Sequence, residues 1–122
     1  MKLPLLLALS ALVLAASAHA ADVSGLWIVS TTLAQTPVTL DCSILQIGSD
    51  LSGWCEPESA DAVPAALTGT VSQNSANWSY DLTVQNQPVR LAYQGTLSAG
   101  GVGMTGQLTY GTSSAGLTAA RK

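Results

Sequence analysis

A five-residue pattern occurs four times in this chain: an apolar residue, a polar one, glycine, any residue and another apolar one. The first, third and fifth residues of a strand share a face, so each copy sets a glycine between two apolar side chains. Inward glycines let a small sheet bend sharply and close on itself. The copies are residues 51–55, 67–71, 93–97 and 104–108.

The rest of the chain also indicates strands. Short runs alternate apolar and polar residues between Gly, Pro, Asn and Ser, and no window after residue 20 has helical periodicity. We predict eight strands, at about 25–32, 37–47, 50–56, 65–72, 76–84, 88–97, 101–110 and 114–121. Short connections favour an antiparallel up-and-down meander, and the inward glycines favour its closure into an eight-stranded barrel. The expected fold class is all-β.

The two cysteines predict the register of one hairpin. If Gly48 and Ser49 form a two-residue turn, then Cys42 and Cys55 lie directly opposite each other on neighbouring strands. Cα atoms of such a pair lie close enough for a cross-strand disulfide. The alternative is that the two cysteines bind a metal ion, but no histidine follows residue 20 to complete such a site.

The face that carries the two cysteines gives a consistent interior. We expect its side chains nearly to fill the barrel and to leave a small cavity or none, so that a small apolar ligand has little room. The predicted inward residues are Trp27, Val29, Leu40, Cys42, Ile44, Leu51, Cys55, Leu67, Val71, Trp78, Tyr80, Leu82, Leu91, Tyr93, Leu97, Met104, Leu108, Leu117 and Ala119.

The first twenty residues have the form of a secretory signal peptide. Lys2 gives a positive start, an apolar stretch follows, and Ala18-His19-Ala20 forms an A-x-A cleavage site. The apolar run is short for crossing about 30 Å of hydrocarbon, so a membrane anchor fits less well. We expect cleavage after Ala20, a single mature domain of residues 21–122 without a membrane span, and a periplasmic or extracellular location.

Charge and residue types exclude several functions. Residues 21–122 contain three basic and seven acidic residues, so no basic surface for nucleic acid is expected. Serine and threonine are plentiful, but there is no histidine to act as their general base, and no catalytic motif or metal-ligand spacing occurs. A carboxylate pair among Glu56, Glu58 and Asp61 is the remaining catalytic alternative, but solvated loop acids are far commoner than a glycosidase pair. We therefore predict a protein that is not an enzyme and has no cofactor or bound metal.

Acidic side chains gather near the longest predicted connection, 57–64. Glu56, Glu58 and Asp61 are the candidates for a loop at the mouth of the barrel that touches a partner or a cation. The interpretation that we favour is a plain solvated connection. The loops at this end, 33–36, 57–64, 85–87 and 111–113, are predicted to be longer than those at the other end.

The outward face of the first three strands is unusually apolar. Alternation points Leu26, Ile28, Leu45, Ile47 and Trp54 away from the interior. Contiguous exposed patches of this kind mark partner or self-association sites, and Trp is a favoured interface anchor. The alternatives are that the first strand has the opposite inside–outside assignment or that loops cover the patch.

Trp27 and Arg121 are predicted to contact each other in a structural role. The first and last strands of a closed barrel are neighbours, so the Arg121 guanidinium can lie on the Trp27 indole and plug one end.

Gly25-x-Trp27 and Arg121 together resemble the structural signature of the calycins, which include lipocalins, avidins and bacterial metalloprotease inhibitors. The segments SGLW, DLSGWC, AALTGTV, NWSYDL, AYQGTL and MTGQLTY follow the avidin succession of strands over the whole mature chain. The resemblance implies a barrel fold, but the residues with which avidins bind their ligand are not carried over. Ile28-Val29 stand where an avidin has Asn and Ser, and Cys55 stands where it has Tyr.

The metalloprotease inhibitors are similar in size, export and a single disulfide. They inhibit through an N-terminal tail, and here only residues 21–24 precede Gly25. The leading hypothesis is an exported, non-catalytic binding or interaction module on a calycin-like barrel, with an unidentified protein partner or a second copy as its target. The alternatives are a secreted protease inhibitor and a structural envelope protein without a small ligand.

Overall fold

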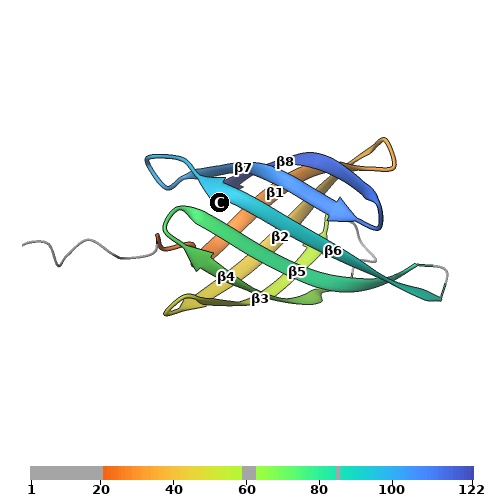
Figure 1. Cartoon of the computed structure of the whole chain (residues 1–122), viewed down its shortest axis with the longest axis horizontal. Coiled ribbons are helices and arrows are strands. Elements are labelled where there is room, and N and C mark those ends of the chain that lie inside the picture. The colour runs from red at the N-terminus through yellow and green to blue at the C-terminus, as the bar shows by residue number, and fades with distance from the viewer. Residues whose placement is uncertain (1–20, 59–62, 85) are drawn as a thin grey trace, which may run out of the picture.

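The protein is a closed barrel of eight antiparallel strands that follow one another in chain order (Figure 1). A computed structural model describes residues 21–58, 63–84 and 86–122, and the predicted signal peptide lies outside them. None of the described residues is helical, so the all-β up-and-down barrel is confirmed. The strands are β1 (Gly25–Leu33), β2 (Thr36–Ile47), β3 (Asp50–Pro57), β4 (Ala65–Ser72), β5 (Ser75–Val84), β6 (Gln87–Leu97), β7 (Gly103–Tyr110) and β8 (Ser113–Arg121).

The predicted strands match these bounds closely. The largest difference is at β7, which begins at Gly103 and not at residue 101. A turn explains the difference, because the Gly101 N–H donates to the Ser98 carbonyl and the Ser98 N–H donates to the Gly103 carbonyl. Residues 98–102 therefore belong to the connection from β6 to β7.

The interior of the barrel is filled by apolar side chains. Every predicted inward residue is buried except Leu82, which is half-buried near the end of β5. Two further core residues, Val23 and Ala76, are fully buried and were not predicted. Val23 lies before β1, so the alternation of inward and outward residues in strands gives no prediction for it. Ala76 lies at the start of β5, opposite Gly95.

The cysteines form the predicted disulfide. Cys42 on β2 and Cys55 on β3 are register partners, their Cα atoms are 4.0 Å apart, and both side chains are buried. Closing a loop of this length stabilises a fold by about 3 kcal/mol in the chain-entropy account. A structural disulfide indicates a compartment that is not reducing.

The connections lie at the two ends of the barrel. The β2–β3, β4–β5 and β6–β7 connections share one end with the C-terminus, at the left of Figure 1. We call this the closed end. The prediction that the opposite end has mostly longer loops is wrong: three of its four connections are two residues long, and only that between β3 and β4 is longer.

Candidate functional site

Arg121 joins the first strand, the last strand and the segment before β1 at the closed end. Its guanidinium carbon lies 4.5 Å from the centroid of the Trp27 ring. The guanidinium also donates to the carbonyl oxygens of Asp22, Ser24 and Gly101, at 2.6, 2.6 and 2.8 Å. Through these charge-assisted hydrogen bonds and the cation–π contact, Arg121 helps to close the barrel at this end.

The segment 21–24 covers the same end. Val23 is fully buried, its carbonyl accepts a hydrogen bond from the Trp27 indole at 3.0 Å, and its N–H donates to the Gln46 side chain at 2.8 Å. The Ala21 N–H donates to the Gln73 carbonyl. These contacts hold the segment against the barrel. A segment held in this way is not free to reach into a protease, which disfavours the tail-type inhibitor.

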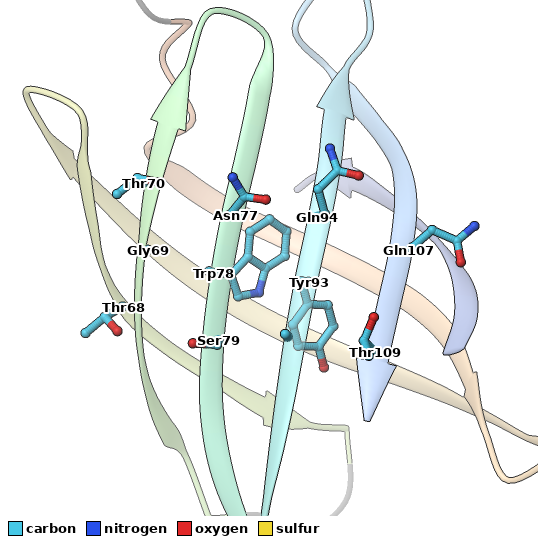
Figure 2. A pocket seen from close by; sticks show the side chains of 11 residues that line it. Thr68, Gly69, Thr70, Asn77, Trp78, Ser79, Tyr93, Gln94, Gln107 and Thr109 are labelled. Carbon is cyan, nitrogen blue, oxygen red and sulfur yellow. The ribbon is translucent and has the colours of Figure 1, made fainter. Parts of the chain in front are cut away.

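Three aromatic side chains form the centre of the interior. The Trp78 and Tyr93 rings stack with centroids 5.2 Å apart. Figure 2 shows the two side chains on the neighbouring strands β5 and β6. The Tyr80 and Tyr93 hydroxyls share a hydrogen bond of 2.5 Å. Burial raises the pKa of Tyr80, and burial together with the adjacent Tyr80 raises that of Tyr93. The Trp78 indole N–H has no acceptor among the described residues.

The end opposite the closed end has an apolar rim among the described residues. Six half-buried apolar residues pack on the core there: Leu33, Val38, Ala65, Leu82, Val89 and Tyr110.

The acidic candidates near this end do not form one loop. Glu56 lies inside β3 opposite Asp41, because the strand continues as far as Pro57, which pairs with Leu40. Glu58 is exposed directly after β3, and Asp61 lies outside the described residues. Glu56 therefore lies in the strand, as the predicted bounds 50–56 had it, next to the connection, and a role for it at the mouth stays a prediction.

The outer apolar residues are exposed together. The exposed fractions are 53% for Leu26, 52% for Leu45, 69% for Ile47 and 55% for Trp54. Ile28 is half-buried, between the register partners Asp41 and Ala120. We call these five residues the Trp54 patch. No described loop covers its four exposed members.

The register of β1, β2, β3 and β4 explains how the patch is assembled. Leu26, Ser43, Trp54 and Ala66 are successive register partners and make one row across the outer face. The next row toward the closed end contains Leu45, and the row after it contains Ile47. Same-face rows are two residues, or about 7 Å, apart, so the apolar side chains are near neighbours.

A hollow lies beside Trp54 on this face. It has a volume of about 390 Å³ and is lined by Leu45, Gly53, Trp54, Ala66 and Leu67 together with Ser43 and Ser52. Gly53 has a φ of +136°, and a Cβ there would overlap the Ser43 carbonyl oxygen, so β2 and β3 approach each other closely beside the hollow. The patch therefore combines an exposed aromatic ring with an adjoining depression, a shape that accepts one side chain of a partner. The sequence predicts the outward direction of Trp54 but not that Ala66 and Leu67 line the hollow beside it, because the β3–β4 register follows from no short turn.

The outer face of β4, β5, β6 and β7 is different in character. A hollow of about 290 Å³ is lined there mainly by exposed or half-buried hydroxyl and amide side chains, including Thr70, Asn77, Gln94 and Gln107 (Figure 2). It lacks an exposed aromatic or apolar anchor, because Trp78 and Tyr93 at its floor are buried in the core. The two outer faces therefore differ in what they offer a partner.

The described residues offer little for other chemistry. Within residues 21–58, 63–84 and 86–122, no three His, Cys, Asp or Glu side chains come together as a metal site requires. None of the described segments forms a helix with the length and hydropathy needed to cross a bilayer.

The closed eight-stranded antiparallel barrel is compatible with the calycin resemblance. Searches of protein-family models and of curated proteins found no match to this chain.

Proposed function

We propose that this protein is an exported, non-catalytic binding module on a calycin-like barrel, and that it docks on a protein partner through the Trp54 patch. The observation that carries the proposal is the exposure of Leu26, Leu45, Ile47 and Trp54 by more than half on neighbouring strands. Contact between water and an exposed apolar cluster is unfavourable, and a partner that covers the cluster removes this contact and so gains binding free energy.

Export is supported by two independent features. Residues 1–20 read as a signal peptide with cleavage after Ala20, and the Cys42–Cys55 disulfide indicates a compartment that is not reducing. A location in the periplasm or outside the cell accounts for both.

Docking by the patch is favoured over ligand binding inside the barrel. Large side chains such as Trp27, Trp78 and Tyr93 fill the interior, whereas the patch has both an exposed anchor and a hollow. The residue types also favour binding over catalysis, as no general base accompanies the many hydroxyl groups.

The docking proposal is tested by site-specific photo-crosslinking in the cell that produces the protein. A photoreactive side chain at Leu45 is expected to yield one discrete protein adduct, and the same side chain at Thr109, on the polar outer face, none. Trp54→Asp should abolish the Leu45 adduct because it places a charge in the apolar contact, whereas Val102→Asp, at another exposed apolar residue, should leave it intact.

Light scattering on the purified protein and on Trp54→Asp separates a foreign partner from a second copy. An adduct at Leu45 that survives Trp54→Asp, or equal adducts at Leu45 and Thr109, would refute the proposal.

A further inference from the structure

Acidic residues lie at both ends of the Trp54 patch. Asp41 and Glu56 are register partners in the row next to Leu26 and Trp54, and Ile28 pairs with Asp41 in that same row. At the other end of the patch Asp50 pairs with Ile47, beside the β2–β3 turn. The Asp41/Glu56 row and the Ile47/Asp50 row are three steps of about 7 Å apart, so an extended partner segment of about six residues reaches all three carboxylates.

Basic residues do little to offset these acids. Lys122 lies near Asp41, with 3.9 Å between its Nζ and Asp41 Oδ1, and both side chains are substantially exposed. Asp41 Oδ1 is buried and accepts no hydrogen bond from the described residues, so a partner's cation must approach this carboxylate from its exposed side. Arg90 is paired with Asp81 on β5 and β6, and Arg121 is bound to carbonyl groups at the closed end.

We propose, as an inference that rests on the docking function above, that the Trp54 patch selects a protein segment carrying an apolar side chain flanked by lysine or arginine. The apolar side chain enters the hollow beside Trp54, between Gly53 and Ala66. The flanking cations meet Asp41 and Glu56 on one side and Asp50 on the other. Complementary charge around an apolar centre supplies specificity and a faster encounter.

A second copy of the chain fits this surface poorly. A two-fold axis in the plane of the contact can run along the strands or across them. In the first case Asp50 of each copy faces Asp50 of the other, and in the second it faces the Asp41 and Glu56 row. Acidic groups would oppose one another at both edges of the contact, which disfavours self-association.

The test starts from a random peptide library displayed on phage and selected on the oxidised mature protein, with counter-selection on Trp54→Asp. The enriched peptides are expected to carry an aromatic or aliphatic residue between lysines or arginines. One enriched peptide and its Glu-substituted counterpart are then synthesised, and their affinities are measured by fluorescence anisotropy at low and at high salt.

The charge-neutralised variant Asp41→Asn/Asp50→Asn/Glu56→Gln should bind the cationic peptide about tenfold more weakly at low salt, with a shallower salt dependence. Asp81→Asn removes an acid far from the patch and should bind like the parent protein. Thermal unfolding of each variant checks that the barrel is folded.

The outcomes separate this inference from the docking function. Peptides that need Trp54 but show no preference for positive charge would overturn the cationic partner and leave the docking function standing. The absence of any Trp54-dependent peptide would overturn both. Concentration-dependent dimerisation that Trp54→Asp abolishes would make a second copy the occupant and overturn the cationic partner.

Discussion

At the scale of single residues, the glycines of the repeated pattern allow neighbouring strands to approach closely. A Cβ on Gly53, Gly69 or Gly106 would overlap a carbonyl oxygen of the adjacent strand, that of Ser43, Asn77 or Gln94. Gly95 differs, since a Cβ there would meet the flexible Met104 side chain. In three copies of the pattern the glycine therefore lets two backbones approach closely in a tightly coiled sheet. In the fourth copy the glycine makes room for a core side chain.

A pair of glycine substitutions on adjacent strands tests this account. Gly106→Ala should destabilise the protein by about 3 kcal/mol or more, because the backbone of β6 and β7 must move apart. Gly116→Ala is the matched control, since its Cβ would meet only the Gly106 carbonyl oxygen at 4.0 Å. Thermal unfolding should show a midpoint lower by about 10 °C or more for the first and nearly unchanged for the second. Equal midpoints would contradict the close-approach role.

At the scale of elements, the β1–β2 turn departs from the usual chemistry of hairpins. Ala34 and Gln35 both have positive φ, 49° and 68°, in a two-residue connection closed by the Leu33–Thr36 pair. Turns of this primed type favour Asn and Gly, which adopt such angles at low cost. The Ala34 N–H donates to the Tyr110 hydroxyl at 2.9 Å, which helps to hold the turn.

The double variant Ala34→Asn/Gln35→Gly should therefore stabilise the protein by about 1 kcal/mol, because it relieves strain in the turn and leaves the Ala34 backbone N–H in place. Urea unfolding measures the free energy. The control is Thr112→Asn in the β7–β8 connection, where Gly111 has a positive φ and Thr112 does not. This substitution relieves no strain, so the free energy of unfolding should change little. A loss of stability in the double variant would show that the turn is not strained.

Much of the fold followed from the sequence because alternation and turn position fix a hairpin together. Gly48 and Ser49 define the β2–β3 register, and that register predicts both the Cys42–Cys55 bridge and the outward direction of Trp54. Other features do not follow from the sequence, because no short turn or strand period constrains the chain there. The hollow between Trp54 and Ala66 depends on the β3–β4 register across a longer connection, and the burial of Val23 depends on contacts with Trp27 and Gln46.

At the scale of the whole molecule, the barrel is one cooperative unit whose core includes two phenols. Strand pairing runs without interruption from β1 to β8 and back to β1, and Arg121 ties the last strand to the segment before the first. Tyr80 and Tyr93 lie inside this ring and are 5% and 2% exposed. Their ionisation is therefore coupled to unfolding of the barrel as a whole.

This coupling predicts loss of stability at alkaline pH. Burial raises the pKa of both Tyr80 and Tyr93 in the folded protein. In the unfolded chain the phenols release their protons near pH 10, as ordinary tyrosines do, while the folded protein retains them. Above about pH 10 the unfolded state thus binds fewer protons than the folded state, so the free energy of unfolding falls as pH rises. Below that pH the contribution is fully present.

Urea unfolding as a function of pH measures the effect. Each buried phenol contributes a slope of up to about 1.4 kcal/mol per pH unit above pH 10. Tyr80→Phe/Tyr93→Phe keeps the stacked rings and removes both ionisable groups, so its free energy of unfolding should decline less steeply over the same range, whatever its value at neutral pH. An equal slope in the parent and the double variant would mean that the alkaline loss has another origin, and a flat profile in the parent would mean that the phenols ionise without opening the barrel.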